Sequence, residues 1–335
     1  MSASPVPARR YGAGSLLSRN AALLAALLVF AAFSLSSSQF ATGSNIRNMA
    51  IEGANSAVMA VGMTFVIMTA GIDLSVGAIL FLSTAAATEL FVHGMPAAWA
   101  PLIAVLVGVI LGAINGATVA YIAISPLIVT LATLNLYRGI GGHLTQFTTT
   151  FLPPQMQTLG TSTVGSVPTP IIVMVVVAVL GALLLRATVF GRYVQAIGSN
   201  PDAARELGLP VRSVLIGVYG ISGLTAGLAG LIENGRLNAL QPTVGLGEEF
   251  TVITAVVLGG TSLFGGKGSI FGSLLGVAIL QMVADGLVLA NLSPYIFDML
   301  RASVLLAAVL AGTLQGRGLP LGWLGRRRRW GVMRV

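Results

Sequence analysis

The chain has 335 residues, of which 55% are hydrophobic and only 8% are charged. A soluble domain carries roughly a quarter charged residues, so this composition excludes an ordinary soluble protein and, with repeated apolar runs, indicates an all-α polytopic membrane protein. The sequence contains no cysteine, which excludes disulfides and thiolate metal sites. The net charge of +8 comes mainly from short basic flanks of apolar runs. That distribution favours membrane topology and contact with anionic lipid over nucleic-acid binding.

Ten apolar segments are predicted to form transmembrane helices within residues 19–315, after a basic cytoplasmic tail at 1–18 and before an Arg-rich tail at 316–335. The first segment lacks a convincing small-residue cleavage site, so it is interpreted as an anchor rather than a signal peptide. Residues 146–168 carry no charge and are expected to form a long loop. The ten segments fall near residues 20–38, 53–70, 75–93, 98–122, 126–145, 169–187, 211–233, 250–265, 268–289 and 294–314.

The basic residues predict the orientation in the membrane. Six crossings from a cytoplasmic N-terminus return the chain to the cytoplasm at 187–211, which contains Arg192 and Arg205. Ten crossings leave the four-arginine run 326–329 on the same side. Because cytoplasmic loops carry an excess of Lys and Arg, both the N- and C-termini are expected to be cytoplasmic.

Glycines spaced four residues apart predict closely packed helices. Such glycines lie on one face of a helix and allow a neighbouring backbone to approach. Three stripes follow this spacing, namely Gly108, Gly112 and Gly116; Gly223 and Gly227; and Gly272 and Gly276.

Two glycine-containing segments indicate two weakly related halves. Gly-Ile-Asp-Leu-Ser-Val-Gly at 71–77 and Gly-Thr-Ser-Leu-Phe-Gly-Gly at 260–266 each lie between two predicted spans. Many transporters consist of related repeats with glycine-interrupted segments in matching positions.

A short polar stretch at 198–208 separates two apolar spans and is predicted to contain a capped helix of about two turns. Asn200 can accept a hydrogen bond from a free first-turn amide. Pro201 suits the first helical position, where the amide has no intrahelical partner. Gly208 suits the left-handed residue after the last turn, and Pro210 prevents continuation.

This helix is too short to be stable alone in water and needs a surface to pack on. Asp202 is expected to pair with Arg205 three residues later. Ala203, Ala204 and Leu207 offer a small apolar face. An ordinary amphipathic linker is the alternative interpretation, but the pattern favours a surface that another protein contacts.

Four ordered motifs resemble those of the ribose-type sugar permease family of ATP-binding-cassette importers. Asp202-Ala203-Ala204 followed by Gly208 resembles the Glu-Ala-Ala-x-x-x-Gly coupling motif of such permeases, with Asp in place of Glu. The remaining matches are Gly71-Ile-Asp-Leu-Ser-Val-Gly77; Asn115-Gly116 with Pro126-Leu-Ile-Val-Thr-Leu131 and Arg138-Gly139; Gly191-Arg-Tyr193; and Gly259-Gly-Thr-Ser-Leu263 with Gly266-Lys-Gly-Ser269. The resemblance covers about residues 45–312.

The resemblance implies a bacterial inner-membrane permease that translocates a pentose or hexose by alternating access. It implies three protein partners: a cytoplasmic subunit that binds ATP and Mg, a periplasmic or extracellular sugar-binding protein, and a second permease copy, identical or related. The chain itself is expected to bind no cofactor and to be no enzyme. The residues expected to contact the ATPase are Asn200, Asp202, Ala203, Ala204, Arg205, Glu206 and Gly208.

Asp73 is a candidate for the translocation pathway or for a break between helices. A carboxylate at membrane depth costs on the order of a few kcal/mol and usually marks function. Asp73 is expected either to accept hydrogen bonds from sugar hydroxyls or, as the favoured interpretation, to cap the following helix together with Ser75. A pair between Asp73 and Lys267 is a further expectation. The full set of candidates is Asp73, Ser75, Asn115, Thr130, Thr261 and Ser262.

Other functions find less support in the sequence. Residues 260–267 fail as a phosphate-binding loop, since the glycine spacing is wrong and Gly268 replaces the required Ser or Thr. His93 and His143 have no partner at metal-binding spacing. Asp298 and Arg301 are expected to form only a local ion pair. An ion-coupled secondary transporter of a small polar solute remains the alternative, whereas an intramembrane enzyme lacks a recognisable catalytic set.

Overall fold

The computed structural model describes residues 21–316, apart from the side chains at 294, 308 and 311–316. The predicted tails, 1–18 and nearly all of 316–335, lie outside the described residues. The helices are α2 (Ala21–Ser36), α3 (Gly43–Glu52), α4 (Ala54–Met68), α5 (Val76–Val92), α6 (Ala100–Ile122), α7 (Pro126–Leu144), α8 (Pro154–Thr161), α9 (Thr169–Ala187), α10 (Val189–Ser199), α11 (Pro201–Glu206), α12 (Val211–Leu237), α13 (Glu248–Leu258), α14 (Ile270–Leu289) and α15 (Pro294–Gly316), with a 3₁₀ turn η1 (Ala97–Trp99). Four two-residue strands complete the described fold, β1 (Thr150–Phe151), β2 (Thr163–Val164), β3 (Val167–Pro168) and β4 (Ala239–Leu240).

The fold is all-α, as predicted, and each of the ten predicted spans contains a helix. The largest difference is in the span expected at 250–265, where α13 covers only Glu248–Leu258. Gly259 and Gly260 end this helix, and Gly260 adopts a left-handed backbone with φ of 90°. Glycine permits that conformation at no steric cost, and it commonly terminates helices.

Only some of the helices are long and apolar enough to cross a membrane alone. Among residues 21–316 four satisfy that criterion, namely α6 with its preceding turn, α9, α12 and α14, and the pair α3–α4 adds a fifth if its 46° bend lies within one span. The helices α2 and α5 are apolar but shorter. The ten crossings therefore remain a prediction.

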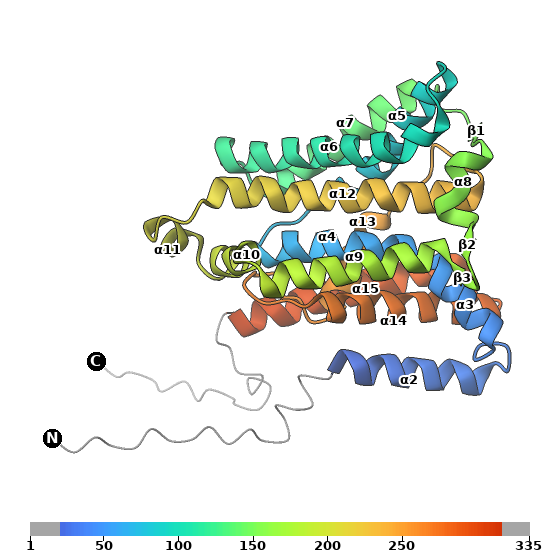
Figure 1. Ribbon diagram of the computed structural model, residues 1–335. Coiled ribbons are helices and arrows are strands. Elements are labelled where there is room, and N and C mark those ends of the chain that lie inside the picture. The colour runs from blue at the N-terminus through green and yellow to red at the C-terminus, as the bar shows by residue number, and fades with distance from the viewer. Residues whose placement is uncertain (1–20, 317–335) are drawn as a thin grey trace, which may run out of the picture.

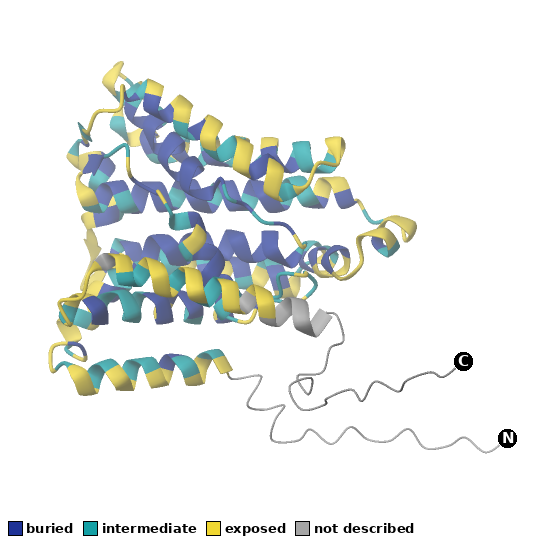
Figure 2. Cartoon of the chain, turned by 180° about the vertical axis from the view of Figure 1, so that it is seen from behind, coloured by how far each residue is buried: buried dark blue, intermediate teal, exposed yellow. Residues whose placement is uncertain are grey.

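The long helices form a bundle with two different ends (Figure 1). One end, called here the α11 end, carries α10 and α11, and the other, called the α8 end, carries α8 and the four short strands. Helices α4 and α12 form the centre, and all 15 residues of α4 are buried (Figure 2). A helix that carries apolar residues on every side, as α4 does, needs a fully enclosed position of this kind.

The predicted glycine stripes lie at helix contacts. A Cβ atom added at Gly108 or Gly112 of α6 would collide with the backbone of Gly223 or Tyr219 of α12, and one added at Gly223 would collide with Gly108. Gly276 meets the Ala255 backbone of α13 in the same way. The two backbones thus approach at distances that only glycine allows.

The segment predicted as a loop at 146–168 contains α8 and three of the short strands, β1, β2 and β3. β1 pairs with β4 in antiparallel register, Thr150 opposite Leu240, and β2 pairs with β3. A helix of eight residues is not stable in isolation. Gly160 of α8 packs directly on the backbone of α12 at Gly235, and this tertiary contact accounts for a helix that periodicity did not reveal.

Candidate functional site

The α11 helix has the predicted caps. Asn200 Oδ1 accepts hydrogen bonds from the amides of Asp202 and Ala203, at 3.1 and 3.0 Å. Gly208 has a φ of 75°, and its amide donates to the Arg205 carbonyl at 3.0 Å. Leu209 N–H, one residue later, donates to the Ala204 carbonyl. Side-chain and backbone bonds therefore define both ends of this six-residue helix.

α11 is anchored on one side and open on the other. Ala204 is only 3% exposed, whereas Leu207 is 80% exposed. Asp202 and Arg205 form the expected ion pair, at 2.7 Å, and both side chains are largely in solvent. Such a pair contributes little to stability. The exposed Leu207 and the charges around it leave a surface on which a partner can pack.

The segment before α11 is also helical, which the sequence did not predict. The stretch at 187–211 was expected to be a loop with one helix, but α10 covers Val189–Ser199. Thr188 caps α10 by accepting a hydrogen bond from Gly191 N–H at 3.2 Å. α10 is strongly amphipathic and short, so it did not match the pattern of a membrane span.

The end of α10 contacts two glycine-rich loops that are far apart in sequence. A Cβ atom at Gly198 would lie 2.6 Å from Gly266 N and closer still to the Met68 carbonyl oxygen. The amide of Gly266 donates to that same Met68 oxygen at 2.9 Å. Gly265 packs against Gly198 and Ala70. The helix before α11 therefore contacts both the loop after α4 and the loop after α13.

The loop after α4 leads from this contact to a buried carboxylate. Asp73 is fully buried and accepts three hydrogen bonds: from Ser75 N–H at 3.0 Å, Ser75 Oγ–H at 2.6 Å, and Ser222 Oγ–H of α12 at 2.8 Å. Asp73 thus bonds to Ser75 as expected, but the residue at the N-cap of α5 is Ser75, and no side chain caps that helix. The expected pair with Lys267 is wrong, because Lys267 is exposed at the α11 end while hydroxyl groups inside the bundle satisfy Asp73.

Further buried polar groups extend this network to α6 and α7. Asn115 donates to Ser75 Oγ at 2.8 Å, and Tyr137 OH donates to Asn115 Oδ1 at 3.2 Å. Thr130 Oγ1–H donates to the Ile72 carbonyl at 3.2 Å. Asn115 precedes the end of α6 by seven residues, or about 10 Å at the helical rise. The loop therefore enters the bundle interior from the α11 end.

The six candidates for the pathway or helix break form two groups. Asp73, Ser75, Asn115 and Thr130 belong to the network just described, and each is fully buried. Thr261 and Ser262 lie in the loop after α13, and their side chains form no hydrogen bond with these four residues. Thr261 Oγ1 is buried without a hydrogen-bond partner among the described residues, and Ser262 Oγ accepts from Phe264 N–H at 3.3 Å.

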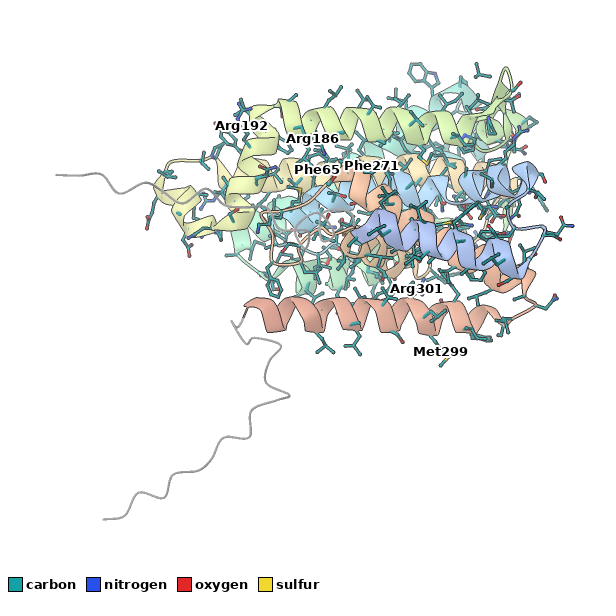
Figure 3. The ribbon with its side chains drawn as sticks, turned by 90° about the horizontal axis from the view of Figure 1, so that it is seen from below. Phe65, Arg186, Arg192, Phe271, Met299 and Arg301 are labelled. Atoms are coloured by element: carbon teal, nitrogen blue, oxygen red, sulfur yellow. The ribbon has the colours of Figure 1, made fainter. Side chains whose placement is uncertain are left out.

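Sequence reasoning missed two acids in the first turn of α13, Glu248 and Glu249, which lie near arginines of other helices. Glu248 Oε2 accepts a hydrogen bond from the Ser56 hydroxyl at 2.9 Å. Arg301 of α15 donates to Thr251 Oγ1 at 2.6 Å and, as predicted, pairs with Asp298 at 2.9 Å. Figure 3 shows Arg301 on the side of α15 that faces the other helices, whereas Met299 points away.

Arg138 and Glu249 lie where two short helices meet. Arg138 donates to the carbonyls of Val244 at 2.6 Å and Gly77 at 3.3 Å, and its guanidinium lies over the Phe81 ring. A Cβ atom at Gly77 would lie 2.7 Å from Glu249 Oε2. α5 runs from this point to the α8 end and α13 to the α11 end, so the two helix N-termini meet inside the bundle.

The acids were missed because the span was predicted to begin at 250, which assigned Glu248 and Glu249 to a loop. Both precede an apolar run without an intervening turn residue, and Gly245 and Gly247 stand just before them. An acidic pair at the first turn of a helix is favourable to the helix dipole. That signal would have placed the start of the helix correctly.

Residues 45–309 match a family described as the permease component of the branched-chain amino acid transport system. This match covers most of the chain. The chain belongs to this permease family. It is therefore a multi-pass membrane transport component, and the family is one of transporters and not of catalytic enzymes.

Curated relatives within the same class of protein cover nearly the whole chain. The chain is 39% identical over 315 residues to the ribose import permease protein of Escherichia coli (strain K12), with 92% of this chain and 98% of that protein covered. It is 35% identical to the D-allose transport system permease protein of the same strain, covering 85% and 88%. It is 34% identical to the L-arabinose ABC transporter permease protein of Azospirillum brasilense, covering 92% and 91%. No solved structure matches the chain.

The family resemblance that the four motifs indicated is thus confirmed over most of the chain. The motif residues also lie together in space to a degree that the sequence did not indicate. The loops at 69–75 and 259–269 meet at the end of α10, directly before the motif that starts at Asp202.

Proposed function

We propose that the chain is the membrane-spanning subunit of an importer that carries a monosaccharide, of the pentose or hexose class, across the bacterial inner membrane. Three relatives that align over most of the chain are named for ribose, allose and arabinose. Transport proceeds by alternating access, driven by a partner ATPase that binds ATP and Mg, while this chain binds no cofactor. A sugar-binding protein delivers the substrate at the α8 end.

The contact of α10 with both glycine loops is the observation that carries this proposal. α11 presents Leu207, Glu206 and the Asp202–Arg205 pair outward, and this surface is where the ATPase subunit binds. Movement of α11 passes to Gly198 at the end of α10. Gly198 contacts Met68 at the end of α4 and the loop that follows α13, and Gly265 of that loop contacts Ala70, so movement at the α11 end reaches both segments at once.

The four fully buried candidates act at the helix break rather than as a sugar-binding surface. Asp73 already accepts three hydrogen bonds from Ser75 and Ser222, and such a group gains little from a further bond to a substrate hydroxyl. Asn115 and Thr130 likewise bond within the bundle. The network holds the extended loop in the position from which α5 starts.

A second permease copy binds on the exposed face of α7. Asn135 is exposed there, and its amide donates only to the Leu131 carbonyl of its own helix, at 3.0 Å. Facing hydrocarbon, an asparagine carbonyl without a partner is unfavourable, whereas a second polypeptide can satisfy it. Ala132 and Gly139 on the same face are small enough to allow close approach.

Cross-linking tests this face without interference, because the chain has no cysteine. Asn135→Cys is expected to form a disulfide between two copies, which requires Cα atoms within about 7 Å. Val176→Cys on the exposed face of α9 is the matched control and is expected to stay monomeric. Equal cross-linking of the two variants argues against α7 as the contact.

Transport in reconstituted vesicles tests the proposed function. The permease is combined with its ATPase and binding protein, and uptake of labelled ribose, arabinose and allose is measured with and without ATP. Uptake of at least one sugar that requires both ATP and the binding protein supports the proposal. ATP-independent uptake of all three contradicts it.

An ion-coupled secondary transporter is the second candidate, and the charged group at the start of α13 favours it. Glu248, Glu249, Arg138 and Arg301 lie within the bundle, and such intramembrane charges commonly belong to ion or proton pathways. A proton gradient imposed without ATP distinguishes the two functions. Solute uptake under that condition establishes the secondary transporter.

A further inference from the structure

An apolar pocket of about 310 Å³ lies between α2, α3, α4, α9 and α14. Its lining includes Phe30, Met49, Ala57, Met174, Leu274 and Met282, so all five helices contribute. The pocket forms where α3 bends away from α4 by 46° and leaves room between α4 and the peripheral helix α2. Its lining includes no residue of α11, of the Asp73 network or of α13.

The chemistry of the lining selects a flexible hydrocarbon. Gln281 is the only lining residue with a polar side chain, and its amide donates to Glu52 at 3.2 Å rather than into the pocket. Methionine side chains adapt their shape to an irregular apolar partner. An apolar cavity of about 150 Å³ holds benzene, so about 310 Å³ matches roughly twelve carbons of a chain.

Hydrocarbon is what surrounds this part of the protein. α2 lies at the edge of the bundle (Figure 1), and Leu24, Leu27 and Leu28 on its other face are exposed, Leu28 by 70%. A pocket on the inner face of such a helix is in direct reach of acyl chains in the bilayer.

A cation stands beside the pocket on α3. Arg47 follows the lining residue Ile46 and precedes the lining residue Ala50 by one helical turn. Arg47 is exposed and forms no ion pair with any other residue of 21–316. α3 lies toward the α8 end, where a bilayer presents its headgroups. An arginine pairs readily with a phosphate oxygen at such a position.

We propose that this pocket is a phospholipid site in the leaflet at the α8 end, in which one acyl chain occupies the space behind α2 and Arg47 pairs with the headgroup phosphate. The site does not depend on the transported solute. The bound chain fills the volume that the bend between α3 and α4 leaves empty and thereby holds α2 against α14.

Native mass spectrometry of the purified full-length chain tests the site by counting retained phospholipids. Ala278→Phe fills the pocket from an exposed position on α14, and Arg47→Gln removes the cation. Each is expected to lower the lipid-bound fraction several-fold. Ala31→Phe on the exposed face of α2 and Arg186→Gln at the α11 end are the matched controls and are expected to retain lipid as the wild type does.

Addition of defined ligands to delipidated protein separates the contribution of the acyl-chain pocket from that of the phosphate contact at Arg47. Dilauroyl phosphatidylglycerol is expected to rebind to the wild type, whereas soluble glycerophosphate alone is not. Binding of glycerophosphate with equal affinity indicates a free-anion site and overturns the proposal. The proposal is also overturned if the wild type retains no lipid, or if the control variants lose as much lipid as Ala278→Phe and Arg47→Gln. Disulfide formation between copies of an Ala278→Cys variant overturns it as well, because a second copy then occupies the pocket.

Discussion

At the scale of single residues, Asp73 shows how this chain keeps a carboxylate inside a membrane protein. Its two oxygens accept three hydrogen bonds from Ser75 and Ser222, and Asn115 in turn bonds Ser75. A buried charge without partners is very costly, whereas one that accepts several hydrogen bonds is tolerated. The carboxylate is thus the common acceptor that joins the loop after α4 to α12.

Replacement of Asp73 by alanine is expected to destabilise the bundle. The hydroxyls of Ser75 and Ser222 would lose their acceptor, and an unsatisfied buried donor costs about 1–3 kcal/mol. The expected result is a clear fall in the midpoint of thermal unfolding of the purified chain in detergent. Asp73→Asn keeps one carbonyl acceptor, so its unfolding midpoint is expected to fall less than that of Asp73→Ala.

Ser83→Ala is the matched control for this prediction. Ser83 is equally buried, but its hydroxyl bonds only to the Leu80 carbonyl of its own helix, at 3.2 Å. Its removal leaves no donor on another element without a partner. If Asp73→Ala unfolds at the same temperature as Ser83→Ala, the network does not carry the stability assigned to it.

At the scale of elements, local chemistry predicted α11 well. Asn200, Pro201 and Gly208 each have a strong preference for one position of a helix end, and the structure places all three there. α8 and α10 were not predicted, because tertiary contacts stabilise them, such as Gly160 against α12 and Gly198 against the Met68 backbone. Contacts between distant segments leave no periodic pattern in the sequence.

Gly208→Val is expected to uncouple ATP hydrolysis from uptake while the chain still inserts. Gly208 has a φ of 75°, which a β-branched residue adopts only at a cost of about 1–3 kcal/mol. The strain would displace the end of α11 from the position at which it is proposed to contact the ATPase. The measurement is the ratio of sugar taken up to ATP hydrolysed in reconstituted vesicles.

Gly43→Val tests whether strain or bulk causes the effect. At Gly43, as at Gly208, an added Cβ atom meets nothing within 4 Å, but Gly43 has an ordinary backbone conformation. Gly43→Val is expected to keep the wild-type ratio. Normal sugar uptake per ATP in Gly208→Val would show that α11 does not need its left-handed end.

The glycine contact between α6 and α12 gives a second prediction at this scale. Gly223→Val would bring side-chain atoms onto the Gly108 backbone and force the two helices apart, so little folded protein is expected. Gly220→Val on the same helix meets no atom within 4 Å at its Cβ and is expected to be tolerated. The two variants are compared by their yield of monodisperse protein on size-exclusion chromatography. Equal yields would contradict a role of the glycine stripe in packing α6 against α12.

At the scale of the whole molecule, the loops after α4 and α13 show which part of the candidate site could be predicted from the sequence and which could not. The motifs that contain Asp73 and Thr261 were apparent as sequence segments, but their meeting at Gly198 depends on the path of α4 and α13 through the bundle. The charged residues Arg138 and Glu249 come from distant elements. No spacing in a single sequence relates them, and only the assembled bundle brings them together.

The orientation in the membrane stays a prediction, and it can be tested because Arg186, Arg192 and Lys267 all belong to segments at the α11 end (Figure 3 labels the first two). Because basic residues are retained on the cytoplasmic side, the α11 end is expected to face the cytoplasm. Leu207→Cys, directly after α11, and Val164→Cys on β2 place exposed thiols at the two ends of the bundle, in a chain without other cysteines.

In intact cells a membrane-impermeant maleimide is expected to label Val164→Cys at once and Leu207→Cys only after permeabilisation. Six crossings before α11 and ten in all further require that Ser15→Cys and Val335→Cys, in the tails outside the described residues, behave as Leu207→Cys does. Labelling of Leu207→Cys in intact cells would reverse the orientation. Opposite behaviour of the two tails would require an odd number of crossings, and the most direct cause would be that one of the short helices, α5 or α13, does not cross the membrane.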